Sequence, residues 1–249
     1  SFGVGAKPSE HGVFGYSVFD REAGQVRNLL SGWDNDFSPE DFQTIPSVST
    51  IATDHGVRSF TVGPGEYEGS GFTRVNMSGA EYVAARGFDD RVLHTAKILR
   101  TKTKSLTYLY FPELDSIAHS SGVASTEWLN KLEELDSAIK QIVTSLDKDS
   151  ALIVTADHGI VDVARENHIL LDEIELAGLV AVTGDPRNAF LYFEPNIDLE
   201  TTQRSLQERL GEAVIVANPD ELYATGWLTT PVANQRFLPD LFLISQSTV

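Results

Sequence analysis

The chain has 249 residues, of which 41% are hydrophobic, and a formal net charge of -17 at pH 7. This length and hydrophobic content are those of a folded domain, and the acidic charge excludes a general nucleic-acid surface, which needs a basic footprint. Because the chain has no cysteine, disulfides and thiolate metal sites are excluded, and Asp, Glu and His remain as candidate metal ligands.

The first third of the chain predicts a β-hairpin. Two strand-like segments, Val13 to Phe19 and Gln25 to Leu30, flank the turn-forming residues 20–24. We expect one domain over residues 1–249, in which residues from about 10 to 75 partly form a cap or hairpin insertion.

The rest of the chain alternates predicted helices and strands. Capping residues such as Ser38 and Ser125 mark helix starts, and Gly56 marks a helix end. Further predicted helices cover residues 47–55, 78–85, 89–99, 125–146 and 199–210. Predicted strands cover residues 57–62, 105–111, 151–154, 189–193, 214–216 and 241–244. This alternation is typical of an α/β fold, with 105–111 and 151–154 as buried strands.

Polar residues follow these two buried strands directly. Asp115 and His119 come after the first strand, and Asp157 and His158 come after the second. A right-handed βαβ unit brings both strand ends to one edge of a sheet, where open α/β sheets bind their ligands. We therefore expect the four side chains to face one site.

The ligand chemistry of this site favours a metal centre. Asp115 and His119 are four residues apart and share one face if a helical turn follows the strand. Asp157 and His158 can serve the same site if the backbone turns at Gly159. Oxygen and nitrogen ligands suit zinc, manganese or iron. Two such pairs predict a two-metal centre, whose ions, ~3.5–4 Å apart, clamp the attacking and leaving oxygens of a displacement at phosphorus.

Two motifs carry a family resemblance. The sequence YFPELDSIAHSSG at 110–122, followed by TADHG at 155–159, resembles the alkaline phosphatase superfamily and most closely its nucleotide pyrophosphatase/phosphodiesterase branch. PSEHGV at 8–13 and GDPR at 184–187 resemble further landmarks of bacterial members. The resemblance spans about the whole chain. It implies a three-layer α/β sandwich with a mainly parallel central sheet.

The resemblance also implies a ligand set. Asp115 and His119 would bind one zinc ion and Asp157 and His158 a second, with manganese or iron as alternatives. The family completes these sites with a C-terminal His, an upstream Asp and a nucleophilic Thr or Ser, which residues 1–249 do not supply. We therefore expect the chain to be truncated at both ends, with the catalytic nucleophile upstream of Ser1.

The implied activity is metal-dependent hydrolysis of phosphate esters. The resemblance favours a nucleotide pyrophosphatase/phosphodiesterase whose Thr alkoxide attacks phosphorus, followed by hydrolysis of the phosphoryl-enzyme by water. The expected partner is a small phosphorylated substrate such as a nucleotide or phosphodiester. The alternatives are a phosphomonoesterase, phosphomutase or phosphonate hydrolase of the same superfamily. An alternative of another class is a catalytically inert fragment or binding domain.

Several polar residues have simpler interpretations. Asp157 alone also suits a helix N-cap. Asp54-His55-Gly56 repeats the letters of the second ligand pair but ends a predicted helix, so His55 is interpreted as part of a C-cap. Glu113 is expected either to orient a metal ligand or to be an exposed carboxylate. Structural or surface roles are favoured for His11, His94, His168 and Trp128, whereas Ser70, Thr73 and Arg187 are candidate substrate contacts.

The sequence contains no membrane signal. Apolar runs fall short of the ~18 residues of a membrane span, and the first residues lack the layout of a signal peptide. A cytoplasmic location is favoured, with a secreted or periplasmic location as the alternative because the native N-terminus is expected to lie elsewhere. No nucleic-acid duplex is expected as a partner, and the sequence leaves the oligomeric state open.

Overall fold

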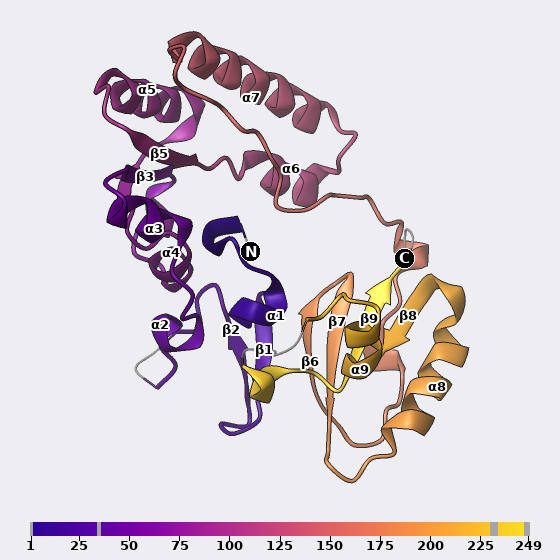
Figure 1. Ribbon diagram of the computed structural model, residues 1–249. Coiled ribbons are helices and arrows are strands. Elements are labelled where there is room, and N and C mark those ends of the chain that lie inside the picture. The colour runs from indigo at the N-terminus through magenta and orange to yellow at the C-terminus, as the bar shows by residue number, and fades with distance from the viewer. Residues whose placement is uncertain (1, 34–35, 230–233, 247–249) are drawn as a thin grey trace. The chain divides into compact units, whose positions relative to one another are not determined.

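A computed structural model describes residues 2–33, 36–229 and 234–246 (Figure 1). Its contacts divide the chain into two compact units. The first unit contains residues 6–45 and 163–249, and the second contains residues 2–5 and 46–162. Such a division does not test whether both units fold as one domain, so the single domain over 1–249 stays a prediction, as does a cap within residues 10–75.

The second unit is built on a three-stranded parallel sheet in the order β4-β3-β5. The central strand β3 (Arg58–Gly63) pairs in parallel with β4 (Glu81–Ala84) and with β5 (Ser105–Leu109). The helices of this unit are α3 (Val48–Asp54), α4 (Gly71–Asn76), α5 (Gly87–Arg100), α6 (Glu113–Ser121) and α7 (Thr126–Ser145). Short 3-10 helices, η1 (Phe2–Val4) and η2 (Gly65–Tyr67), complete it.

Buried apolar side chains join the sheet of the second unit to its helices. Phe60 and Val62 of β3 pack with Ile98 of α5, and Val92 of α5 packs with Ile142 of α7. Figure 1 shows α5 and α7 on one face of the sheet and α3 and α4 on the other. The helices therefore cover both faces of the sheet, as parallel sheets require.

The first unit contains the predicted hairpin, which is confirmed. Strands β1 (Ser17–Asp20) and β2 (Gln25–Asn28) pair antiparallel. A separate antiparallel sheet has the order β6-β7-β9-β8. Its strands are β6 (Leu179–Asp185), β7 (Asn188–Phe193), β8 (Val214–Ala217) and β9 (Leu241–Ser245). The helices are α1 (Pro8–His11), α2 (Pro39–Phe42), α8 (Leu199–Leu210) and α9 (Pro219–Ala224).

The antiparallel sheet buries both of its faces. Leu191 of β7 packs in one cluster with Leu206 of α8, whereas Phe190 packs in a second cluster with Leu222 of α9. Neighbouring residues of a strand point to opposite faces, so α8 and α9 cover opposite sides of this sheet. Four 3-10 helices, η3 (Arg165–Asn167), η4 (Leu171–Glu173), η5 (Gly211–Ala213) and η6 (Gln235–Phe237), lie in the connections.

The α/β class and the parallel sheet are confirmed, but two local predictions are wrong. Residues 78–85, predicted as a helix, contain the strand β4, whose Tyr82 and Val83 are residue types that favour strands. Residues 151–154, predicted as a buried strand, form no strand, and Ile153 is 82% exposed. An apolar β-branched run predicts an extended backbone, but it does not determine whether that segment pairs with another strand.

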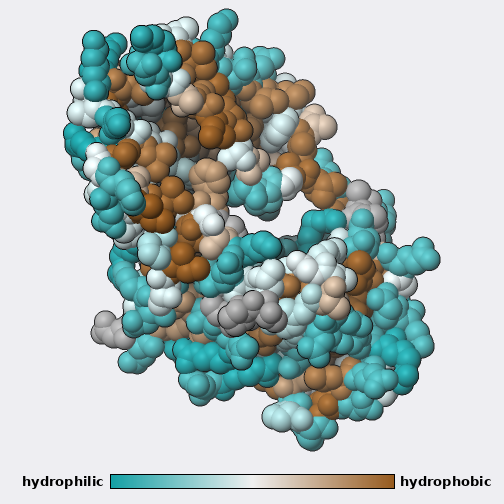
Figure 2. Space-filling view, viewed as in Figure 1, coloured by the Kyte–Doolittle hydropathy of each residue, from teal (hydrophilic) through white to brown (hydrophobic). Residues whose placement is uncertain are grey.

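Exposed apolar side chains gather on the second unit. Figure 2 shows hydrophobic surface over the region of α5 and α7, and the exposed residues of this region include Leu129, Leu132 and Val143 of α7. Val154, in the segment that follows α7, is 64% exposed. In the described parts of the chain, no helix is both long and apolar enough to cross a membrane.

Candidate functional site

Asp115 and His119 form a close pair on α6. This helix starts directly after β5 and places the two side chains one turn apart, with His119 Nε2 3.5 Å from Asp115 Oδ1. The His119 side chain is 77% exposed. Asp115 Oδ1 is buried and has no hydrogen-bond partner among the described residues. The predicted helical turn, with both side chains on one face, is therefore confirmed.

Asp157 and His158 form a second pair at a bend in the chain. His158 Nε2 lies 3.6 Å from Asp157 Oδ2, and both side chains are largely exposed. Asp157 Oδ1 accepts a hydrogen bond from the backbone N–H of His158 at 3.1 Å. The helix-cap interpretation of Asp157 does not hold, because the next helical element, η3, begins only at Arg165.

The carboxylates of both pairs raise the pKa of the same tyrosine, Tyr110. Burial, followed by the charges of Tyr67 and Asp157 and more weakly that of Asp115, raises the pKa of Tyr110 to about 12. Tyr110 continues from β5 toward α6 and stacks on Tyr108 with ring centroids 6.3 Å apart. Tyr110 therefore keeps its proton at neutral pH, and its hydroxyl is able to donate a hydrogen bond.

The structure does not gather the four predicted ligands into one cluster. Within residues 2–33, 36–229 and 234–246, no group of three or more Asp, Glu or His side chains is arranged to hold one metal ion. Each pair supplies two ligands, whereas zinc in proteins binds three or four protein groups. The two-metal centre and the role of its four ligands therefore stay predictions.

The atoms of each pair nevertheless fit a metal. The buried Asp115 Oδ1, without a hydrogen bond, has a lone pair available beside an imidazole nitrogen. The Nδ1 atom of His158 lies 2.9 Å from the carbonyl oxygen of Gly159. Donation from Nδ1–H to this carbonyl selects the tautomer in which Nε2 is the metal-binding atom, an arrangement common among His ligands.

A second Asp–His pair has the same spacing but a different environment. Asp90 and His94 lie one turn apart on α5, with His94 Nε2 3.5 Å from Asp90 Oδ1. Unlike Asp115, Asp90 is engaged elsewhere, because its Oδ2 accepts a hydrogen bond of 2.8 Å from the backbone N–H of Arg86. Asp90 thus accepts a hydrogen bond from the backbone at the start of α5. The surface role predicted for His94 is consistent with this arrangement.

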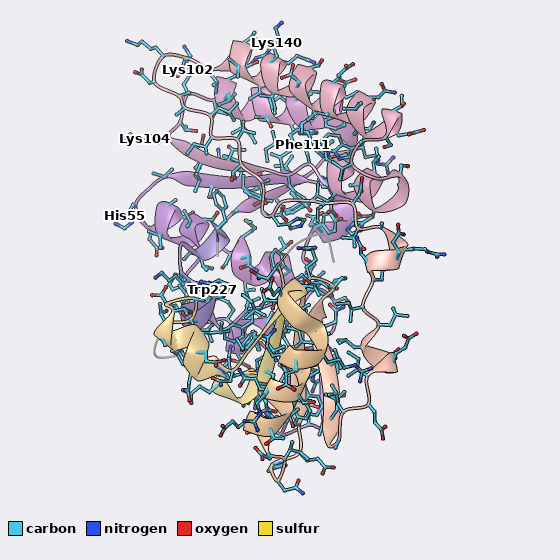
Figure 3. All side chains as sticks on the ribbon, turned by 90° about the vertical axis from the view of Figure 1, so that its right-hand side faces the viewer. His55, Lys102, Lys104, Phe111, Lys140 and Trp227 are labelled. Atoms are coloured by element: carbon cyan, nitrogen blue, oxygen red, sulfur yellow. The ribbon has the colours of Figure 1, made fainter. Side chains whose placement is uncertain are left out.

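Asp54-His55-Gly56, which has the same sequence as residues 157–159, forms a helix end, as predicted. His55 is the C-cap of α3, and its Nδ1 lies 2.8 Å from the carbonyl oxygen of Ile51. Gly56 has a φ of 76°, in the left-handed region that favours glycine at helix ends. His55 lies at the surface of its unit in Figure 3.

Glu113 is not an exposed carboxylate. Its Oε1 accepts a hydrogen bond of 2.6 Å from Nη1 of Arg91, whose side chain is only 3% exposed. The sequence did not single out Arg91. The signal for it is its position on the buried stripe of α5, which also contains Thr95 and Ile98.

The other candidates have structural partners. Ser70 caps α4 by accepting a hydrogen bond from the backbone N–H of Thr73, and the role of both residues as substrate contacts stays a prediction. His11 is 4% exposed and its Nδ1 accepts a hydrogen bond from the backbone N–H of Val13, in agreement with a structural role. The backbone N–H of Arg187 donates to Asp185. His168 lies near the carbonyl of Val163, and Trp128 is half-buried on α7.

Comparisons with known proteins identify related folds. A family model described as type I phosphodiesterase / nucleotide pyrophosphatase matches residues 1–247. Murine ectonucleotide pyrophosphatase / phosphodiesterase 5 superimposes with a TM-score of 0.72 at 16% identity, covering 98% of this chain and 65% of that one. An inactive variant of the murine protein in complex with AMP gives the same values. The human protein gives a TM-score of 0.66 at 15% identity, covering 96% of this chain and 63% of that one.

A curated relative matches a shorter segment. GPI ethanolamine phosphate transferase 2 of Kluyveromyces lactis is 37% identical over 64 residues, which are 26% of this chain and 8% of that protein. The chain thus spans less than two thirds of each solved structure and a small part of the transferase. At such identities the solved structures support the α/β fold with its parallel sheet.

Proposed function

Because this chain belongs to the type I phosphodiesterase / nucleotide pyrophosphatase family of the alkaline phosphatase superfamily, we propose that its protein hydrolyses phosphodiester or pyrophosphate bonds in nucleotides. We propose that metal ions assist this reaction and that Asp115, His119, Asp157 and His158 bind them. The observation that carries the proposal is the Asp115–His119 pair, in which a buried carboxylate oxygen without a hydrogen bond faces an imidazole nitrogen 3.5 Å away.

The proposed ions are two zinc ions, with manganese or iron as alternatives. Carboxylate oxygen and imidazole nitrogen suit all three metals. Bound metal ions supply Lewis-acid chemistry, which activates the attacking hydroxyl and stabilises the leaving oxygen of a displacement. Metal binding tests the four proposed ligands directly, because its measurement does not depend on which residue is the nucleophile.

The side chains of this chain have separate tasks in the proposed site. The carboxylates of Asp115 and Asp157 would bind metal ions, and the imidazoles of His119 and His158 would complete each pair as neutral ligands. Tyr110, with a pKa of about 12, would be a protonated hydroxyl that can donate a hydrogen bond to the substrate without adding negative charge. This property suits a group near an anionic phosphate.

The proposed substrate class is a nucleotide or a related phosphodiester. The structure of the inactive murine relative contains AMP, and a nucleotide phosphate is the corresponding group for this chain. A net charge of -17 repels such an anion, and bound divalent ions reverse the sign of the local field. Metal binding is therefore also needed for substrate binding.

A second candidate is transfer of a phosphate ester group to an alcohol instead of water. The local match to a phosphate transferase, 37% identical over 64 residues, favours it. Both reactions use displacement at phosphorus and differ in the group that accepts the phosphoryl moiety. Product analysis with an added alcohol distinguishes them, because transfer gives a new ester whereas hydrolysis gives only the free acid.

Zinc affinity of the metal-free protein tests the ligand assignment. Asp115→Asn and Asp157→Asn should each weaken zinc binding at least about tenfold, because each removes an anionic ligand. Asp90→Asn is the matched control, since Asp90 has the same spacing to a histidine but holds the start of α5. Chelator competition measures the affinities, and hydrolysis of a nitrophenyl ester of a nucleotide measures activity. Equal affinities for Asp115→Asn and Asp90→Asn would contradict the assignment.

A further inference from the structure

The start of α6 is held by a buried ion pair that reaches across from α5. Arg91 is 3% exposed, and its Nη1 donates to Glu113 Oε1 at 2.6 Å. Glu113 is the first residue of α6 and lies two positions before Asp115. A buried guanidinium is costly without a partner, so this contact constrains both helices.

No side-chain cap holds the start of α6. Its N-cap residue is Pro112, which makes no capping hydrogen bond through its side chain. The N-cap residue of α5, Arg86, likewise makes no side-chain cap, although its backbone N–H donates to the Asp90 carboxylate, whereas Ser125 caps α7. The contact between Arg91 and Glu113 does not cap α6, since it involves no backbone N–H, but it ties the first residue of α6 to α5.

Arg91 also holds the linker between β5 and α6. Its guanidinium carbon lies 5.2 Å from the ring centroid of Phe111, and Phe88 of α5 stacks on the same ring at 5.1 Å. Figure 3 labels Phe111 beside these helices. Arg91 thus contacts residues on both sides of Pro112, at the point where the chain leaves the sheet and enters α6.

Several polar atoms around this pair are buried without a hydrogen-bond partner. Arg91 Nε, Glu113 Oε2 and Asp115 Oδ1 are buried and have no hydrogen-bond partner among the described residues. The hydrogen bond to Glu113 is therefore the polar contact through which the Arg91 side chain reaches α6, which also packs against α7. A change at Arg91 removes this polar contact.

From these contacts we infer that Arg91 is a positioning residue: through Glu113 and Phe111 it fixes the start of α6 and so holds Asp115 and His119 in the geometry that binds metal. The inference rests on the proposed metal role of these two residues. Glu113, Asp115 and His119 lie on one continuous helix of 9 residues, about two and a half turns, so a displacement of its first residue moves both ligands. Residues that orient metal ligands change metal affinity by about 10–100-fold.

Four variants separate positioning from simple charge compensation. Arg91→Met and Glu113→Gln each remove one charge, and the double variant removes both and leaves no unpaired buried charge. Arg91→Lys keeps the charge but loses the planar guanidinium. The matched control is Arg58→Met, because Arg58 also pairs with a glutamate, Glu81, at 3.1 Å and contacts an aromatic ring. Arg58 is the first residue of β3 and so lies at the end of the parallel sheet opposite to the end that α6 follows.

Zinc affinity and cobalt absorption spectra of these variants give the first test. We expect Arg91→Met to bind zinc about 10–100-fold more weakly than Arg58→Met, and Arg91→Lys to recover part of the loss. The double variant should lose no more than the larger single loss, because the two residues act as a unit. A double variant that binds zinc as tightly as Arg58→Met, with an unchanged cobalt spectrum, overturns the inference.

Hydrogen exchange of the metal-free protein gives a test that does not require metal. The backbone amides of α6 should exchange faster in Arg91→Met and in the double variant than in Arg58→Met, whereas those of α3 should not change. If the unmodified protein binds no zinc, the proposed function fails, and α6 exchange then decides the positioning by itself. Unchanged exchange in α6 overturns the inference even if zinc binds to the unmodified protein.

Discussion

At the scale of single residues, two Asp–His pairs with the same spacing differ in the hydrogen bonds that their carboxylates accept. Asp90–His94 and Asp115–His119 have the same separation of 3.5 Å and the same helical spacing. One carboxylate already accepts a backbone hydrogen bond, whereas the other has a buried oxygen without one. Because an unsatisfied buried carboxylate oxygen is costly, it marks the pair that gains most from a bound cation.

His11 makes stability depend on pH. Burial lowers the pKa of His11 from 6.5 to about 4. Between these values the unfolded chain takes up a proton that the folded chain does not, so stability is complete above pH 6.5 and falls as the pH falls toward 4. Between pH 7 and pH 5 we expect a loss of about 2 kcal/mol from this residue.

Two histidine variants test this expectation by denaturant unfolding at pH 7 and pH 5. His11→Asn keeps an acceptor for the backbone N–H of Val13 and should remove that part of the pH dependence. His55→Asn, at an exposed helix end, should leave it in place. A pH dependence that is the same in both variants would show that His11 titrates normally in the folded protein.

The motifs and strand ends single out Asp115, His119, Asp157 and His158, whose metal role stays a prediction, but they say nothing of the residues that hold them in place. Arg91 was missed because a charged residue within a helical pattern is normally interpreted as surface. Its burial follows from the rotation of α5, which buries Thr95 and exposes Leu93, and periodicity alone gives that face only to within one residue.

At the scale of elements, helix boundaries follow local chemistry. The start of α7 at Ser125 was predicted from the capping residue, and the side chain accepts a hydrogen bond of 3.1 Å from the backbone N–H of Trp128. The same hydroxyl donates to the carbonyl of Gly122 at 2.8 Å. Because both partners are a few residues away, the sequence alone is enough to predict this helix end.

Removal of this cap should destabilise the protein. Ser125→Ala leaves the N–H of Trp128 without its acceptor, so we expect a loss of about 1 kcal/mol in the free energy of unfolding. Ser137→Ala is the control, because Ser137 lies in the exposed middle of α7, where alanine is the better helix former. Urea unfolding measures both. Equal stability of the two variants would mean that α7 does not depend on its cap.

Elements that need a distant partner were predicted less well. β4 has only four residues and exists because Phe60 to Gly63 of β3 pair with it in parallel. Residues 151–154 have the composition of a strand, but β5 pairs only with β3 in the described chain. Local composition cannot distinguish these two outcomes, because each depends on whether the segment comes to lie beside an edge strand of the sheet.

At the scale of the whole molecule, the family and the fold agree, and the proposed ligands lie on α6 and in the segment that follows α7. The α/β class follows from alternating helices and strands, whereas the antiparallel sheet depends on long-range pairings such as β7 with β9 that short strands do not reveal. The excess of acidic residues, 36 Asp and Glu against 19 Lys and Arg, is a further whole-molecule property. Each carboxylate adds to a field that opposes both folding and anion binding.

This acidic excess should make the metal-free protein more stable in salt. At pH 7 a net charge of -17 destabilises the compact state by self-repulsion. Raising NaCl from 10 mM to 100 mM shortens the screening length from about 30 Å to about 10 Å. Exposed ion pairs such as Arg58–Glu81 lose little, because such pairs contribute about 0–1 kcal/mol each. We therefore expect the unfolding temperature to rise by at least about 2 °C, which corresponds to roughly 1 kcal/mol.

Thermal unfolding followed by circular dichroism measures this effect, with sucrose at equal osmolality as the control for changes in water activity. The rise should occur with NaCl and KCl alike and should be larger than with sucrose, because sucrose stabilises only by its exclusion from the protein surface, whereas the ions also screen charge. A fall in the unfolding temperature would mean that attractive ion pairs outweigh the net repulsion. In that case the carboxylates would be stabilising partners of basic side chains, and the protein would not need bound divalent ions to reduce its field.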